Sequence, residues 1–566
     1  MTTGDVSIPS DYGLPYPSFR IVDTVVTPDG VVPVTQLDVA SQAVAASTRF
    51  VTLQAPTGVG KSLICYLIGE LLDQRRVVTT MTKQLQDQIA ADMPKIAVLK
   101  GKSNYDCRDL HNEYSCAEGK CNDGIKCQWR NEPGCDYYDA ERHARREPRA
   151  VTNAAKWLSD RKFNPDNPAL GSRGLLIIDE AHNLVDELSK FTALTIRRRD
   201  VERYLPRPAS RGWPGDEGQQ RTTDKSALDV AAWTEWSAQW YPSMVSIQAE
   251  MAESGTRETR RRVESLCGAM RVVSTAHDYN LAHADNPYVK DYDAFRNQVS
   301  FTPLWPASAA EDLMFQGIEH VVLTSATLPP ATTQYLGIEP DCVTRICVGQ
   351  GFEPARRPFY YHSCGLRLDG RLTPDGWQHV VSEYFDPFAQ SRLDHNRRGI
   401  VQALSYARAK MVKDMSSLAD QMIIPERGES GRVIESFKRG EFGPNRKILV
   451  SPGTAEEGVD FAGDAAYWQW LTKLPRRPPT ALSKCRDAAL KKSGQGTMRY
   501  SNFVTARDMQ QIVGRVCRSE TDYGETIVFD DHFSYFVRNG FANGDLAEWF
   551  LAAYRIVDHM PAVAPL

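Results

Sequence analysis

The sequence lacks long apolar runs, an apolar N-terminal stretch and an excess of charge of either sign. No hydrophobic segment approaches the roughly 18–20 residues that an α-helix needs to span a bilayer. The N-terminus, MTTGDVSIPSDYG, has neither the basic start nor the apolar core of a signal peptide, so we expect a cytoplasmic protein. Because 67 Lys and Arg oppose 71 Asp and Glu, the net charge is −4, and any binding of nucleic acid must depend on local basic surface.

Repeats, low-complexity tracts and close C-x2-C pairs are also absent, but the cysteines are unevenly placed. Five of the twelve fall within residues 107–135, namely Cys107, Cys116, Cys121, Cys127 and Cys135. In a reducing compartment, clustered thiols indicate metal ligands more readily than disulfides. Four thiolates can hold a [4Fe–4S] cluster or Zn²⁺. Zinc ribbons favour paired C-x2-C motifs, so the spacing argues against a ribbon and leaves a cluster, zinc or no metal as alternatives.

Length and strand-like runs predict several α/β domains. A chain of 566 residues is too long to fold around a single hydrophobic core, so about three or four domains are expected. Residues 50–100 alternate apolar runs (FVTL, RVVTTMT) with helical segments, which is the rhythm of parallel β-α-β units. Further buried strands are predicted at GLLIID and HVVLTS and, in a second α/β region, at GIVQALSY, KILVSPG and ETIVFDD. Residues 476–505 are predicted to be a polar loop region.

Two features of the inserted segments each allow two interpretations. Within the charged, helical stretch 191–315, Trp233, Trp236 and Trp240 share one helical face, which favours a packed core over a base-stacking surface. A basic run after the cysteines is either a phosphate-contacting surface or a solvated helix face. Its members are Arg142, Arg145, Arg146, Arg149, Lys156, Arg161 and Lys162.

The stretch APTGVGKS predicts a phosphate-binding loop. It follows an apolar strand and precedes an apolar helix, as such a loop does. The backbone N–H groups of the loop can surround phosphates, Lys61 can reach the β and γ oxygens, and Ser62 can hold Mg²⁺. A glycine usually stands where this chain has Ala55, but a small residue suffices. The predicted nucleotide-binding residues here are Ala55, Pro56, Thr57, Gly58, Val59, Gly60, Lys61 and Ser62.

A pair of acidic residues follows a predicted buried strand in IIDEAH. Asp179 at the strand end can hold the Mg²⁺ that bridges the β and γ oxygens, and Glu180 can orient and deprotonate the attacking water. Acidic pairs usually lie in solvent. The position at a strand end, downstream of a phosphate loop, favours the catalytic interpretation.

The segment QQIVGRVCRSE supplies a third candidate motif, with Gln511, Gly514, Arg515 and Arg518. The two arginines are three residues apart and share a helical face, where they can stabilise charge on a γ-phosphate as arginine fingers do. The alternative is a pair of surface arginines. Because this motif lies in the second α/β region, a nucleotide held between the two regions would open and close them on hydrolysis.

In order, APTGVGKS, TTMTKQLQDQ, DEAH, TSATL, EGVDF and QQIVGRVCR resemble the motifs of superfamily 2 helicases. The cysteine cluster between the first motif and DEAH, with the flanks KGKSNYDC and GCDYYDAERHA, resembles the XPD/DinG-like branch with its iron–sulfur insert. The resemblance covers nearly the whole chain. It implies an α/β fold of two RecA-like parallel-sheet motor domains, with a cysteine-rich iron–sulfur insert and a helical arch insert in the first.

The resemblance also implies boundaries and residue roles. The first motor domain would comprise 1–100, 141–190 and 316–345, with the iron–sulfur insert at 101–140 and the arch at 191–315; 346–566 would form the second. Asp179 would bind Mg²⁺, and Glu180 would act as general base. The resemblance further implies that Lys61 and Ser62 contact phosphate and Mg²⁺, that Ser325 and Thr327 couple hydrolysis to strand movement, and that Gly458 and Asp460 line the ATP site. Gln511, Arg515 and Arg518 would face the γ-phosphate, and Gln36 would contact adenine. Four of the five clustered cysteines would bind the iron–sulfur cluster, with Cys116 and Cys121 as alternatives for one of the four positions.

The activity implied is that of an ATP-dependent DNA helicase using Mg²⁺ and a [4Fe–4S] cluster. It would translocate 5′ to 3′ on single-stranded or forked DNA, or on a DNA–RNA hybrid, and would act as a monomer. Its role would be in repair, replication or recombination. The protein would be associated with a nucleoid or, if viral, lie in the cytoplasm of the host. One alternative is a DNA-stimulated ATPase that removes proteins or R-loops with little unwinding. Another is a non-motor DNA-binding or redox-sensing module, against which the intact motif residues argue.

Overall fold

The fold is that of a computed structural model of the full chain. It describes residues 6–7, 18–27, 30–56, 58–81, 83–93, 95–122, 127–216, 227–349, 353–453, 461, 463–517 and 521–565. Four predicted site residues, Thr57, Gly458, Asp460 and Arg518, lie outside the described residues. None of the helices in the described part of the chain is long and apolar enough to cross a membrane.

A seven-stranded parallel sheet forms the first motor domain, in the order β14-β5-β13-β9-β6-β8-β7. Its central strands are almost continuously apolar, because a parallel sheet is covered by helices on both faces. The strands are β5 (Phe50–Gln54), β6 (Arg76–Thr80), β7 (Ala97–Val98), β8 (Arg149–Asn153), β9 (Leu175–Ile178), β13 (His320–Ser325) and β14 (Val343–Cys347). The helices are α1 (Gln36–Val44), α2 (Lys61–Leu71), α3 (Lys83–Asp92), α5 (Ala154–Phe163), α6 (Leu184–Thr192) and α13 (Pro330–Tyr335).

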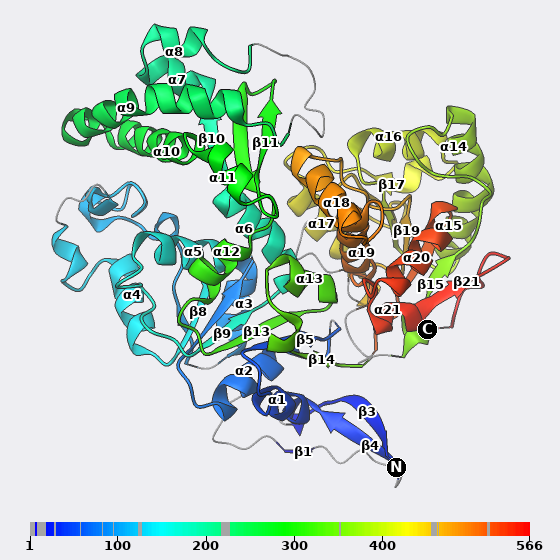
Figure 1. Ribbon diagram of the computed structural model, residues 1–566. Helices are drawn as coiled ribbons and strands as arrows, with labels where there is room; N and C mark the ends of the chain where they lie inside the picture. Colours follow the sequence, from blue (N-terminus) through cyan, green and yellow to red (C-terminus); the bar gives the residue numbers. More distant parts are fainter. Residues whose placement is uncertain are drawn as a thin grey trace.

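A second seven-stranded parallel sheet lies beside the first (Figure 1), in the order β17-β18-β16-β19-β20-β15-β21. Its strands are β15 (Phe359–Tyr361), β16 (Gly399–Gln402), β17 (Met422–Ile423), β18 (Ile448–Ser451), β19 (Trp468–Leu471), β20 (Glu525–Val528) and β21 (Tyr554–Ile556). The helices are α14 (Pro374–Val380), α15 (Asp386–Leu393), α16 (Tyr406–Met415), α17 (Ser430–Lys438), α18 (Ala481–Lys492), α19 (Arg499–Val513), α20 (His532–Ala542) and α21 (Glu548–Ala553). The predicted pair of RecA-like motor domains is therefore confirmed.

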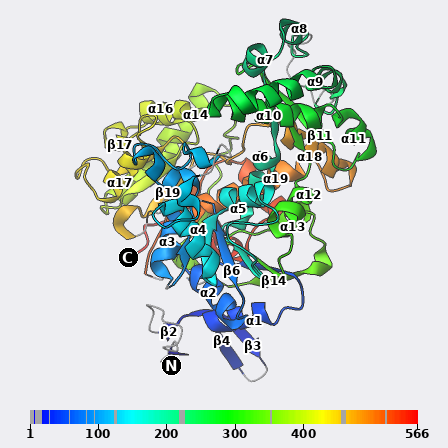
Figure 2. The same cartoon turned by 90° about the vertical axis from the view of Figure 1, so that its left-hand side faces the viewer.

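The arch insert rises above the two sheets in both views (Figures 1 and 2). It has its own three-stranded sheet, in the order β10-β12-β11, and its own aromatic core. Trp233 and Trp236 are buried and pack edge-on against Trp213, with ring centroids 4.7 and 5.5 Å away, whereas Trp240 is half-buried. The elements are β10 (Leu194–Arg197), α7 (Arg198–Tyr204), α8 (Arg207–Arg211), α9 (Ala231–Ser254), α10 (Arg257–Val273), α11 (Ala276–Ala282), β11 (Tyr288–Asp293) and β12 (Gln298–Pro303). The core interpretation of the Trp stripe is confirmed for Trp233 and Trp236.

The cysteine insert between β7 and β8 is built differently. Within its described residues it consists of short 3-10 turns, an isolated bridge between Asp106 and Ser115, and α4 (Asp136–Arg146). Helix α12 (Ala307–Ala309) and a π-helical turn (Ala310–Phe315) return the chain from the arch to β13. Before β5, strand β1 (Val6–Ser7) pairs with β2 (Ser18–Phe19), and β3 (Ile21–Thr27) pairs with β4 (Gly30–Thr35).

The prediction of a polar loop at 476–505 is wrong. Helix α18 begins after Thr480, whose hydroxyl accepts from the Ser483 N–H in a capping box, and α19 begins at Arg499. The charged residues that suggested a loop include buried ones. Arg486, 1% exposed, donates to the Leu304 carbonyl and to the Ser189 and Tyr500 hydroxyls, each at 2.7 Å. These bonds join α18 to the base of the arch and to the first motor domain.

Candidate functional site

The phosphate loop has the expected strand–turn–helix geometry. It leaves the buried strand β5 and enters α2 at Lys61 through two glycines with positive φ, Gly58 (+88°) and Gly60 (+77°). Besides its positive φ, position 60 requires glycine because a Cβ there would collide with the side-chain amide of Gln36. The N-terminus of α2 presents backbone N–H groups and the positive end of the helix dipole, as anion sites do.

Gln36 braces this loop from behind. Its side-chain Nε2 donates to the Val59 carbonyl at 2.8 Å, and its Oε1 accepts from the Arg20 N–H at 3.1 Å. With only 2% of the residue exposed, both ends of the amide are used inside the protein. The structure thus shows Gln36 holding the phosphate loop, and a contact with adenine stays a prediction.

The acidic pair follows β9 and faces the phosphate loop. Lys61 Nζ lies 3.1 Å from Glu180 Oε1. Glu180 has a left-handed backbone (φ +53°), which turns the chain sharply after the strand, and its N–H donates to Asp179 Oδ1 at 3.0 Å. The two predicted catalytic carboxylates and the predicted phosphate-binding lysine therefore come together in one place.

The two carboxyl groups have opposite pKa shifts. Burial, reinforced by the negative charge of Glu180, raises the pKa of Asp179 to about 6. Burial also opposes ionisation of Glu180, but Lys61 and His182 outweigh it and hold the pKa of Glu180 well below its usual range. Glu180 is therefore ionised, as a base must be, and Asp179 is a buried carboxyl whose charge a cation would compensate. This donor set fits Mg²⁺.

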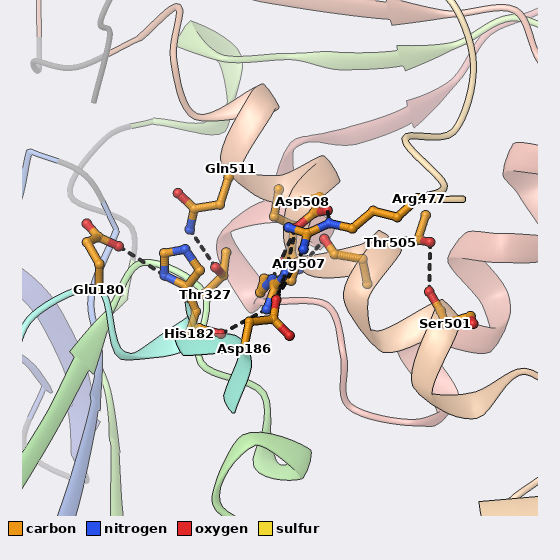
Figure 3. Close-up of polar contacts among 12 residues, drawn as sticks. Glu180, His182, Asp186, Thr327, Arg477, Ser501, Thr505, Arg507, Asp508 and Gln511 are labelled. Atoms are coloured by element: carbon orange, nitrogen blue, oxygen red, sulfur yellow. Dashed lines mark hydrogen bonds and ion pairs between the residues drawn. The ribbon is translucent and has the colours of Figure 1, made fainter. Parts of the chain in front are cut away.

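Polar contacts continue from Glu180 to the second motor domain (Figure 3). His182 Nδ1 lies 2.8 Å from Ser325 Oγ and 3.1 Å from Glu180 Oε2. Two residues after Ser325, the Thr327 hydroxyl accepts from Gln511 Nε2 of α19 at 2.7 Å. The predicted coupling residues thus lie between the acidic pair and the third motif.

Arg515 follows α19 in a buried position, 6% exposed, and its carbonyl accepts from the Phe461 N–H at 3.0 Å. Sequence reasoning missed another part of this interface. Asp186 of α6 and Arg507 of α19 form an ion pair between the two motor domains at 3.0 Å. The available signal in the sequence was proximity to the predicted motifs, since Arg507 lies four residues before Gln511 and Asp186 lies seven residues after Asp179.

The clustered cysteines are near one another in the described part of the insert. Cys107, Cys116 and Cys135 are buried, and Cys116 Sγ lies 3.8 Å from Cys135 Sγ. A Cβ on Gly119 would meet Cys107 Sγ at 2.9 Å and Cys121 Sγ at 3.7 Å, so the glycine lets these two thiols approach the backbone closely. Donor type and this glycine fit a thiolate-bound cluster. Among the described residues, however, no group of three or more His, Cys, Asp or Glu side chains is placed to hold a metal.

Much of the basic run after the cysteines serves internal contacts. Arg149 pairs with Glu70 at 2.6 Å, and Arg142 pairs with Asp139 and donates to two backbone carbonyls. Arg145 donates to Asn167 and the Pro168 carbonyl. Lys156 pairs with Asp160, Arg161 lies over the Trp157 ring, and Arg146 and Lys162 are exposed. The run is therefore mainly structural, which leaves Arg146 and Lys162 as the members most accessible to a phosphate.

Comparisons with known proteins agree with this geometry. Residues 399–540 match the family model of the helicase C-terminal domain. A probable ATP-dependent helicase of Methanocaldococcus jannaschii is 30% identical over 122 residues, 20% of this chain and 19% of that protein. Regulator of telomere elongation helicase 1 of Mus musculus is 22% identical over 309 residues, 47% of this chain and 24% of that protein. The matches thus span about a fifth to a quarter of these relatives.

Solved structures share the fold. An XPD helicase aligns with a TM-score of 0.59 at 14% identity, covering 92% of this chain and 99% of that one. The Xpd4 protein of S. tokodaii aligns with a TM-score of 0.58 at 14% identity, covering 92% and 98%. The chain thus carries a helicase C-terminal domain over residues 399–540, and its fold is similar to that of XPD helicases.

Proposed function

We propose that the protein is an ATP-dependent DNA helicase that translocates 5′ to 3′ on single-stranded DNA and unwinds duplex ahead of it. The observation that carries this proposal is the meeting of motifs from both motor domains. Lys61 and Glu180 pair at 3.1 Å, and Gln511 reaches Thr327 across the interface at 2.7 Å. A nucleotide bound at such an interface changes the relation of the two domains when it is hydrolysed.

In the first motor domain, Lys61 and the loop amides would hold the β and γ phosphates of ATP, and Glu180 would orient and deprotonate the attacking water. Ser62 and Asp179 would hold Mg²⁺, which when bound supplies charge neutralisation at the β and γ oxygens. Lys61 pairs with Glu180 in the structure, so ATP would draw the lysine towards phosphate and leave the carboxylate for the water. Ser325 and Thr327 would pass the change on to the second motor domain.

In the second motor domain, Arg515 and Arg518 would stabilise the charge that develops on the γ-phosphate. Gln511 would face the same phosphate, and Gly458 and Asp460 would line the ATP site. The contact of Gln511 with Thr327 across the interface supports its role, and Arg515 follows four residues later in a buried position.

The cysteine insert would hold a [4Fe–4S] cluster through four of its five cysteines, as a structural element near the point of strand separation. The buried thiols and the close approach of two of them to Gly119 support this assignment. With the arch, the insert would enclose the DNA strand. Base stacking and phosphate contacts would dominate, so little sequence preference is expected.

The test is ATP hydrolysis with and without single-stranded DNA, followed by unwinding of duplexes with a 5′ or a 3′ tail. The proposal expects strand-stimulated hydrolysis and unwinding of the 5′-tailed duplex only, both lost in Lys61→Ala. Unwinding from the 3′ tail would overturn the polarity. Hydrolysis with displacement of a bound protein but no unwinding would favour the translocase instead, and absence of hydrolysis would overturn the motor assignment.

A further inference from the structure

Asp186 stands outside the helicase motifs, yet it receives several contacts from the second motor domain. It lies on α6, and its carboxylate accepts from Arg507 Nη2 at 3.0 Å, Arg477 Nη1 at 3.1 Å and the Tyr500 hydroxyl at 3.1 Å. All three donors belong to the second motor domain, and Figure 3 shows the two arginines converging on this carboxylate from the same side. One carboxylate of the first motor domain thus anchors three donors of the second.

Arg507 connects this anchor to the DEAH turn, residues 179–182. Its guanidinium is 1% exposed and donates through Nη1 to the His182 carbonyl at 3.1 Å. The same group donates to Asp508 Oδ1, so two carboxylates compensate its charge. Burial opposes ionisation of Asp186, but Arg507 and Arg477 outweigh it and lower the pKa of Asp186 to about 2. Such a buried, compensated charge is costly to break on one side only.

The geometry of α19 gives this anchor a consequence for the ATP site. Arg507 and Gln511 are four residues apart, which places them on one side of α19. Arg515 follows in the turn after the last helical residue, Val513, where its N–H donates to the Ile512 carbonyl at 3.3 Å. Arg507 holds the DEAH turn, and Gln511 holds Thr327 one turn later. The anchor therefore fixes the height and rotation of α19 against the first motor domain at the point from which Arg515 extends.

We propose that Asp186 is a positioning residue that, through Arg507, sets α19 against the DEAH turn and thereby places Arg515 for ATP hydrolysis. The inference rests on the proposed function, because it assigns Asp186 a part in the same reaction. If Asp186 were only structural, it would hold the two motor domains together without affecting the position of Arg515. The two roles differ in how the effects of mutations combine.

The experiment is a double-mutant cycle of Asp186→Asn and Arg515→Ala, measuring kcat and KM for ATP with saturating single-stranded DNA. Asparagine keeps the size of the side chain and removes its charge. Arg515→Ala should lower kcat about 10³–10⁵-fold, as loss of an arginine finger does. Asp186→Asn should lower kcat about 10–100-fold with little change in KM, since small displacements of a catalytic group cost up to about 10²-fold. The double variant should be no slower than Arg515→Ala alone.

Two further variants keep the test decisive if Asp186→Asn is poorly folded. Arg477 has a half-exposed side chain, so Arg477→Ala removes one donor without leaving a fully buried charge. It should lower kcat less than Asp186→Asn and should also lose its effect in the Arg515→Ala background. Glu187→Gln is the matched control on α6, because Glu187 pairs with Lys190 of the same helix at 2.7 Å. It should leave kcat unchanged.

Multiplicative losses in the cycle, or a wild-type kcat in Asp186→Asn and Arg477→Ala, would overturn the positioning role. Neither result would contradict the proposed function, which would be contradicted instead if Lys61→Ala still hydrolysed ATP. Melting temperatures without nucleotide accompany each variant. A purely structural defect would lower the melting temperature and would still lower kcat when Arg515 is already replaced by alanine. A positioning role would not lower kcat further in that background, so the cycle separates the two roles.

Discussion

The nucleotide site and the cysteine insert both gather reactive side chains in the first motor domain, but they differ in what holds them. At the predicted nucleotide site, the functional groups bond to one another, Lys61 to Glu180 within the first motor domain and Gln511 to Thr327 across the two domains. In the insert, the thiols are collected by short turns and one isolated bridge, and the described residues show no metal-binding arrangement. The first site is preorganised by protein contacts, whereas in the second we propose that a bound cluster would order the thiols.

The arch insert sharpens this contrast. It has a three-stranded sheet and a core of packed tryptophans, so its order comes from buried apolar surface. The cysteine insert has no comparable sheet among its described residues. Removing a cysteine should therefore affect the insert and leave the motor domains folded, whereas changes at the nucleotide site should act on hydrolysis itself. The following predictions rank these effects by the change in ATP hydrolysis.

Lys61→Ala should abolish ATP hydrolysis while single-stranded DNA binding stays largely intact. The substitution removes a positive charge from the phosphates and leaves other basic surface in place. Turnover with single-stranded DNA and strand binding by fluorescence anisotropy measure the two effects. Turnover near that of the wild type would remove the motor assignment.

Glu180→Gln should bind ATP but lower its hydrolysis about 10²–10⁴-fold, the usual effect of losing a general base. Asp179 remains to hold the metal, so nucleotide affinity should persist. The checks are single-turnover hydrolysis and binding of a fluorescent ATP analogue. Failure to bind nucleotide would show that Glu180 serves chiefly to hold Lys61, its partner in the structure.

The Mg²⁺ dependence of nucleotide binding should change with pH because of Asp179. Its pKa is raised to about 6, so the carboxyl is protonated below that pH and must lose its proton to bind the cation. Apparent Mg²⁺ affinity should therefore fall up to about tenfold per pH unit below about pH 6 and level off above it. Mg²⁺ titrations of nucleotide binding from pH 5 to 8 measure this slope. The same titrations of Asp179→Asn give the pH dependence that comes from protonation of ATP alone. Equal slopes in the two proteins would contradict the assignment of Asp179.

Cys107→Ser or Cys135→Ser should cause the smallest loss of ATP hydrolysis while ending unwinding. Protein purified without oxygen should be brown and carry about four irons per chain, and either substitution should bleach it. Single replacement of Cys116 and of Cys121 then identifies the ligand, because only its loss bleaches the protein. Colourless protein with one zinc would overturn the cluster and leave the motor domains unaffected.

Most of the motor fold could be predicted from the sequence because buried parallel strands are continuous apolar runs. The runs FVTL, LLII and HVVLTS became β5, β9 and β13 of one sheet. The region 476–505 could not be predicted in this way. Its helices carry charged residues on buried faces, and a composition-based reading assigns such residues to solvent. Arg486 and Arg499 are instead buried by partners distant in the sequence.

The sequence alone determined the local chemistry: the glycines that turn the phosphate loop, the carboxylates after a strand and the grouping of the thiols. These features depend on neighbours within a few residues, so they leave a pattern in the chain. The tertiary structure alone decided which groups meet across the motor interface. Asp186 and Arg507 are separated by 321 residues, and neither has a local pattern that names the other. Their contact exists because two parallel sheets bring α6 and α19 together, where a buried charge needs an opposite charge beside it.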